Sequence, residues 1–118
     1  MNTKSAVTAL IQGEKIKSGI VWATQIVDMT AGLSQGEKSG AEKVIRDLIR
    51  MIGYESILAR RTTRDDVWVD VEKDLDMALV MVNSGVCREA AYHLGLALRR
   101  ATSISSRSMR FLMDQGVL

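Results

Sequence analysis

The chain contains no proline among its 118 residues. Proline normally makes up about 5% of a protein, so its absence is informative. Because proline breaks helices and fixes turns, a chain without it favours helices joined to helices. The Asn-Gly and Asp-Gly pairs of β-hairpins are missing too. We therefore expect an all-α fold.

Cysteine, aromatic residues and long apolar runs are also scarce. The single cysteine, Cys87, cannot form a disulfide within the chain, which is typical of a reducing compartment. Aromatic residues make up 4%, so we expect a core of aliphatic side chains and Met. The longest strongly apolar run, residues 77–82, is far shorter than the ~18 residues that span a bilayer. These features predict a cytoplasmic protein with no membrane segment.

Charge is balanced overall but uneven along the chain. The net charge is +2, which is too small to require nucleic acid or an anionic membrane as a partner. Residues 65–76 carry six acidic side chains against one lysine, and residues 88–110 carry five arginines against one glutamate. The chain thus has an acidic middle and a basic C-terminal third.

The first helical stretch carries two apolar rows that face nearly opposite ways. One row consists of Val7, Leu10 and Ile11. The other runs from Ile16 to Val27 and is flanked by Trp22 and Met29. Because an unbroken helix would be apolar on two sides, we expect a break or kink at Gly13, with contact between the first row and a second subunit as the alternative.

The second helix is predicted from a capping signal and a stop signal. Residues Ser39–Glu42 fit a capping box, and Gly53 fits the position after a helix end. A short further helix is expected over residues 54–61. The predicted buried stripe consists of Ala41, Val44, Ile45, Leu48, Ile49 and Ile52.

The third helix is expected to begin after a cap at Thr62 or Thr63. Its C-terminal half is apolar nearly all round, because Met77 and Met81 widen its stripe, and it is expected to lie in the core or at an interface. A fourth helix follows. It is expected to break at the serine-rich segment 102–108, before a short last helix.

No catalytic, metal or cofactor site is expected. His93 is the only histidine, and with Glu89 four residues before it we interpret the two as a local side-chain pair. Cys87 has no second cysteine and is interpreted as a small core residue. Three carboxylates at helical spacing are interpreted as a solvated row: Asp66, Asp70 and Asp74.

Residues 88–104 combine a small residue at Ala91 with a glycine four positions later, at Gly95. This arrangement resembles a helix-turn-helix motif. Ala97 stands where a Ser or Thr usually caps the second helix of that motif, which favours one continuous core helix instead. The resemblance implies DNA contacts by Arg99, Arg100, Ser103, Arg107 and Arg110.

From Asp70 onward the chain also looks like the first helical hairpin of HEPN domains, some of which are ribonucleases. Arg88 and His93 match the Arg-x4-His spacing of those nucleases, but there the motif lies on a later helix. Tetratricopeptide hairpins show a similar pattern, so the pattern is generic.

We expect a bundle of four main helices plus short extra helices, with residues 1–118 forming one domain. The expected function is that of a small non-catalytic interaction or assembly protein, homo-oligomeric or bound to another protein. A DNA-binding regulator is the alternative, and a HEPN-like ribonuclease a remote one. The predicted interface consists of Val7, Leu10, Ile11, Met77 and Met81.

Overall fold

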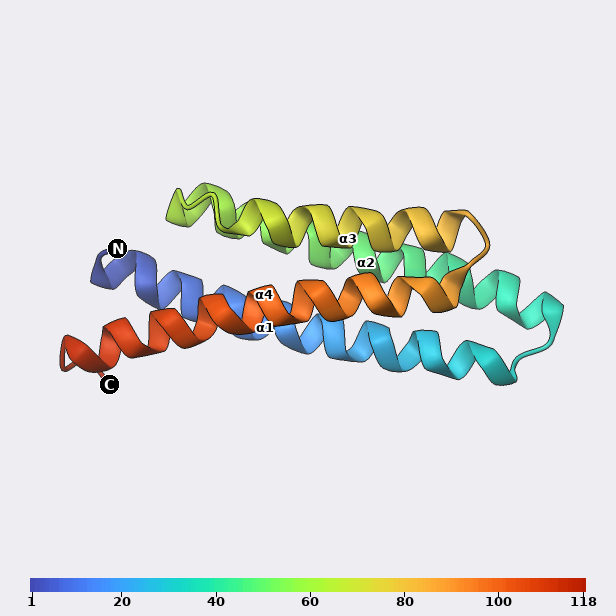
Figure 1. Cartoon of the computed structure of the whole chain (residues 1–118), viewed down its shortest axis with the longest axis horizontal. Coiled ribbons are helices and arrows are strands. Elements are labelled where there is room, and N and C mark those ends of the chain that lie inside the picture. Colours follow the sequence, from blue (N-terminus) through green and yellow to red (C-terminus); the bar gives the residue numbers. More distant parts are fainter.

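The computed structural model describes residues 1–118 and contains four long helices and no strand (Figure 1). The helices are α1 (Thr3–Met29), α2 (Gln35–Thr63), α3 (Trp68–Asn83) and α4 (Cys87–Asp114). One short 3₁₀ helix, η1 (Thr30–Gly32), follows α1. The all-α class and the four main helices are confirmed. The short helices predicted at 54–61 and after 108 are instead the C-terminal turns of α2 and α4.

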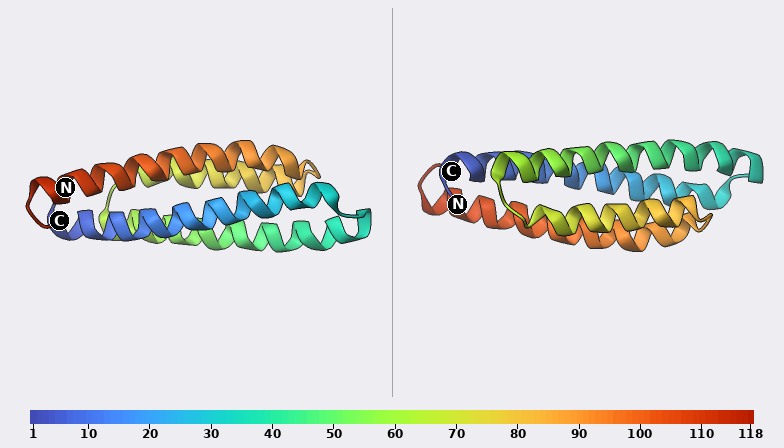
Figure 2. Two further views of the ribbon diagram at one scale, coloured as in Figure 1. Left: turned by 90° about the horizontal axis from the view of Figure 1, so that it is seen from below. Right: turned by 90° about the horizontal axis from the view of Figure 1, so that it is seen from above.

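The four helices lie along one axis and form a rod that measures 53 × 21 × 17 Å. Each helix is antiparallel to the one before it; α1 and α2 form one layer, and α3 and α4 form the other (Figure 2). Both α1 and α3 pack against α2 and α4, so α1 and α3 occupy opposite corners of the bundle. The most extensive packing joins the first helix to the last, α1 to α4.

Helix α1 runs without a break through Gly13, so the predicted kink is wrong. Gly13 is buried against α4, where a Cβ atom would collide with the hydroxyl of Ser105. The glycine is therefore explained by the close approach of two helices and not by a helix end. Ala6 and Ala9, also buried, continue this row of small residues towards the N-terminus.

Helix α2 begins at Gln35, ahead of the start predicted at Ser39. The hydroxyl of Ser34 accepts a hydrogen bond from the backbone N–H of Glu37 (3.3 Å), and the Glu37 carboxylate accepts one from the N–H of Ser34 (2.9 Å). This earlier capping box gives hydrogen-bond partners to the backbone N–H groups at the start of α2, which have none within the helix. Gly53, predicted as a stop, lies inside α2. A glycine inside a helix lowers its stability by about 1 kcal/mol. Burial of the α2 side chains before and after Gly53 offsets this loss.

The threonines predicted to cap α3 are instead the last residues of α2, where the hydroxyl of Thr63 donates to the carbonyl of Ala59 (2.6 Å). Helix α3 starts at Trp68, which is fully buried. The serine-rich segment 102–108 is helical throughout, so the break predicted there is wrong. Ser105 is one of its buried residues, and its small side chain permits the close approach of α1.

All four helices contribute to one core that runs along the bundle. Its largest fully buried side chains include Ile16, Ile20, Ile45, Ile49, Trp68, Leu75, Leu94 and Ile104. Leu48 is only partly buried and packs against the edge of this core. At the surface, Arg60 of α2 donates hydrogen bonds to both carboxylate oxygens of Glu72 on α3 (2.6 and 3.3 Å). None of the helices has the length and apolar character required to cross a bilayer.

Candidate interaction surface

Acidic side chains of α3 pair with part of the basic surface of α4. Arg100 Nε donates to the Asp74 carboxylate at 2.7 Å, and Arg100 Nη1 lies 3.8 Å from Asp70. The hydrogen bond to Asp74 raises the pKa of Arg100 further above its ordinary value. The predicted acidic row is therefore only partly solvated. Asp74 is buried and paired, whereas Asp66 is exposed.

The helix-turn-helix is not formed, because α4 continues without a turn through Gly95. The favoured expectation for this segment, one continuous helix, is confirmed. The side chains predicted to contact DNA are all exposed on α4. Four of them, Arg99, Arg100, Ser103 and Arg107, line one groove of about 330 Å³ beside Asp70 of α3. The fifth, Arg110, lines a different cleft, against α1.

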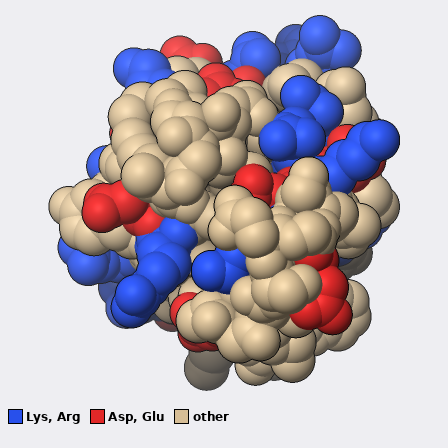
Figure 3. Space-filling view, turned by 90° about the vertical axis from the view of Figure 1, so that its right-hand side faces the viewer, with Lys and Arg blue, Asp and Glu red and all other residues tan.

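Charged side chains of both signs are interspersed on the end of the bundle that carries the α1–α2 and α3–α4 connections (Figure 3). Arg88 and His93, which match the nuclease spacing, are five residues apart on one helix and so point about 140° apart around its axis. Neither the mixed charges at this end of the bundle nor the pair Arg88 and His93 forms a concentrated anion-binding site.

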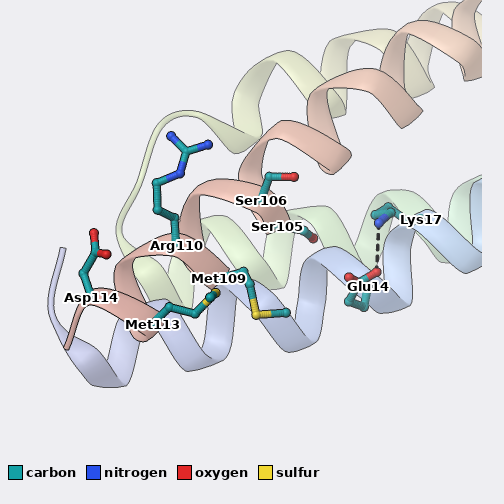
Figure 4. A pocket seen from close by; sticks show the side chains of 8 residues that line it. All are labelled: Glu14, Lys17, Ser105, Ser106, Met109, Arg110, Met113 and Asp114. Atoms are coloured by element: carbon teal, nitrogen blue, oxygen red, sulfur yellow. Dashed lines mark ion pairs between the residues drawn. The ribbon is translucent and has the colours of Figure 1, made fainter. Parts of the chain in front are cut away.

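The cleft that contains Arg110 separates the N-terminal half of α1 from the C-terminal half of α4 and has a volume of about 400 Å³ (Figure 4). It is lined by Glu14, Lys17, Ser105, Ser106, Met109, Arg110, Met113 and Asp114. Lys17 and Glu14 form an ion pair of 3.0 Å within α1. The one buried hydroxyl, that of Ser105, faces Gly13. The lining thus places no nucleophile beside a base.

Cys87 and His93 do not form a reactive pair. Cys87 is buried at the start of α4, and this burial raises the pKa of its thiol, which makes it a poor nucleophile. His93 packs edge to face against Tyr92, with ring centroids 5.2 Å apart. No hydrogen bond or ion pair joins His93 to Glu89. Nowhere do three or more His, Cys, Asp or Glu side chains gather closely enough to hold a metal ion.

The predicted interface residues lie on two opposite corners of the bundle. On α1, Val7 and Ile11 are exposed and Leu10 is half-buried, and this row points away from the buried row of the same helix, as predicted. On α3, Met77 is exposed and Met81 is half-buried. Because α1 and α3 are diagonal neighbours, the two sets cannot form one continuous surface.

A larger apolar surface runs along the outer side of the α1–α2 layer, and we call it the α1–α2 face. It consists of Ile11, Trp22 and Met29 from α1 and Val44, Met51 and Leu58 from α2. These six side chains are between 49% and 70% exposed. Residues seven apart lie on nearly the same side of a helix, which explains how the three α2 residues align.

Hydrogen bonds across the face fix the register of α1 on α2. Lys15 Nζ donates to Glu55 Oε1 at 3.0 Å, and Gln12 Nε2 donates to Glu55 Oε2 at 3.2 Å. The hydrogen bond from Lys15, and then that from Gln12, lower the pKa of Glu55 below its ordinary value of 4.5. Because the two helices are antiparallel, this register places Ile11 at the level of Leu58.

A groove of about 300 Å³ opens at the middle of the face. At its floor, Gly19 lies so close to Ile52 that a Cβ atom on the glycine would be 3.0 Å from the isoleucine side chain. Trp22 and Met51 line the groove on its two sides. Both side chains are exposed, Trp22 to 64% and Met51 to 63%.

The two tryptophans of the chain have opposite environments. Trp68 is fully buried, whereas Trp22 is 64% exposed. A large exposed aromatic side chain among other apolar residues is typical of an interaction surface. Sequence reasoning missed this face because it assigned Val44 to the buried stripe of α2. The seven-residue spacing of Val44, Met51 and Leu58 is the signal in the sequence that could have identified the α1–α2 face.

Comparison with protein-family models, with curated proteins and with solved structures finds no match for the chain. The function is therefore inferred from the bundle's own surface.

Proposed function

We propose that the protein is a non-catalytic helical assembly protein that acts by self-association. The observation that carries this proposal is the α1–α2 face, on which one copy leaves six large apolar side chains about half exposed or more. Burying apolar surface contributes about 25 cal/mol for each Å² removed from water. A second copy that covers this face would therefore gain binding free energy from apolar surface that the single bundle leaves in water.

The rest of the surface supports a binding role over a catalytic one. On the basic stretch of α4, Arg100 forms ion pairs with Asp70 and Asp74 of α3. The thiol of Cys87 is buried. Trp22 is the best anchor on the surface, because tryptophan is enriched among the residues that dominate interface energies.

The test is the mass of the protein in solution, measured by sedimentation velocity over the micromolar range. We expect the wild-type chain to be a dimer or larger. We expect Trp22→Glu to shift it to monomer, because the carboxylate would be buried without a partner. Circular dichroism checks that the variant is folded.

The matched control is Tyr92→Glu, which places the same charge at a 66% exposed aromatic position on α4, outside the α1–α2 face. Its mass should equal that of the wild type. A wild-type chain that stays monomeric throughout this range would contradict the proposed function.

A further inference from the structure

The charges on the α1–α2 face select one way of pairing it with itself. We propose that two copies pair through this face around a two-fold axis parallel to the long axis of the bundle, so that Lys15 of each copy lies opposite Glu55 of the partner subunit. This inference rests on the proposed function, because it requires self-association.

Two arrangements are available to a symmetric pair in which the same face meets itself. The two-fold axis lies in the plane of the interface, either along the helices or across them. An axis along the helices places α1 of each copy over α2 of the other and keeps every residue at its own level of the rod. An axis across the helices places α1 over α1 and inverts the levels.

The Lys15–Glu55 pair distinguishes these arrangements. Lys15 and Glu55 lie at the same level, and their side chains are 60% and 30% exposed. With the axis along the helices, each Lys15 therefore meets the partner's Glu55. With the axis across the helices and centred on Trp22, Lys15 of one copy lies seven residues to one side of the centre. Glu55 of the partner subunit then lies about as far to the other side. At 1.5 Å per residue they are then about 20 Å apart, beyond a Debye length.

The apolar side chains also match level by level in the first arrangement. Trp22 of one copy lies over Met51 of the partner subunit. Ile11 and Met29 lie at the levels of the partner's Leu58 and the partner's Val44. Every helix then has antiparallel neighbours, so the two α1–α2 layers together form a second four-helix bundle.

The face is also large enough to hold two copies together. An interface of ordinary size covers about 800 Å² on each partner. The side of a rod 53 Å long and between 17 and 21 Å wide has room for that area. Trp22 lies near the middle of the face, which is where the residues that dominate interface energies cluster.

Disulfide cross-linking tests the position of the axis. In a Cys87→Ala background, which removes the one native thiol, one chain carries Lys15→Cys and a second, differently tagged chain carries Glu55→Cys. On mild oxidation we expect the mixture to form a disulfide-linked heterodimer and neither chain alone to form a linked homodimer. A mixture that yields no heterodimer, or homodimers as readily, overturns the proposed axis.

Charge reversal provides a second measurement. Lys15→Glu gives a chain with two carboxylates at this level, and Glu55→Lys gives one with two ammonium groups. Each chain alone should associate at least about tenfold more weakly than the wild type, and the mixture should recover by a similar factor, because opposite charges then meet. Arg99→Glu, on the exposed surface of α4, is the control and should change nothing.

The outcomes separate the two proposals. A wild-type dimer that shows neither the heterodimer cross-link nor the charge-reversal pattern overturns the two-fold axis and leaves self-association in place. A wild-type chain that is monomeric in sedimentation overturns both.

Discussion

Gly13 and Gly95 both lie within long helices, but their surroundings differ. A Cβ atom at Gly13 would meet the hydroxyl of Ser105, whereas one at Gly95 would meet nothing within 4 Å. We expect Gly13→Ala to destabilise the fold by about 1–3 kcal/mol through overpacking. Gly95→Ala should stabilise it by up to about 1 kcal/mol, because alanine is the better helix former. Urea denaturation followed by circular dichroism measures both.

Ser105→Ala supplies the control for the collision at Gly13. Without the hydroxyl, the nearest atom to a Cβ at position 13 is the Cβ of residue 105, at 3.4 Å. Gly13→Ala should then cost much less than it does in the wild-type background. An equal cost in both backgrounds would mean that Gly13 is required for a reason other than this contact.

Three leucines differ in burial, and we expect the loss of stability on changing each to alanine to follow the same order. Leu75 and Leu94 are fully buried, and each change to Ala should cost about 2–5 kcal/mol. Leu48, which the sequence placed in the middle of a buried stripe, instead lines the groove of the α1–α2 face. Leu48→Ala should therefore cost less than about 2 kcal/mol in the monomer. Chemical denaturation that ranks Leu48 with the other two would contradict the assigned face of α2.

At the scale of the helices, the contact between α1 and α2 predicts a pH dependence. The pKa of Glu55 is lower in the folded chain than its ordinary value of 4.5. Its contribution to stability is therefore fully present above about pH 4.5 and is lost as the pH falls through the lower folded value. Because the pair is partly exposed, we expect less than about 1 kcal/mol.

Denaturation between pH 3 and 6 measures this contribution. The free energy of unfolding of the wild type should decline as the pH falls through this range. Glu55→Gln should flatten that decline. Lys15→Met should flatten it in part, because Gln12 still donates to the carboxylate. A decline that is unchanged in Glu55→Gln would assign the pH dependence to other carboxylates.

Apolar periodicity predicted four helices correctly, but their ends were misplaced. Gly13, Gly53 and the segment 102–108 were all taken as breaks, and all lie inside helices. Glycine and serine can weaken a helix, and they can also let two helices approach closely. A single sequence does not show which of these two roles a given glycine or serine has. Ser105 against Gly13 has the second role, which depends on a neighbour 92 residues away in the chain.

The candidate surface was predictable only in part for the same reason. Of the five residues predicted at the interface, only Ile11 belongs to the α1–α2 face. Periodicity shows that a helix has a second apolar side, but it does not show which helix lies beside it. The pairing of α1 with α2, fixed by contacts such as Lys15 to Glu55, decides which exposed side chains join into one surface.

At the scale of the whole molecule, the rod shape makes the dimer measurable. The single bundle is 53 Å long and 21 Å across at most, measured on its Cα atoms. Side-by-side pairing through the α1–α2 face widens the particle and leaves its length nearly unchanged. Small-angle X-ray scattering should therefore show a longest dimension close to that of the Trp22→Glu monomer. A longest dimension near twice that value would indicate end-to-end pairing.

The extensive packing between α1 and α4 has a consequence for how the chain folds. Of the four helices, α1 leaves the ribosome before the others and has its most extensive packing with α4. The buried row from Ile16 to Val27 therefore stays incompletely covered until α4 has been made. Contacts between distant parts of a chain form late, because closing a long loop costs entropy before the contact stabilises it. The nascent chain thus exposes its N-terminal apolar row to chaperones or to other nascent copies until α4 docks.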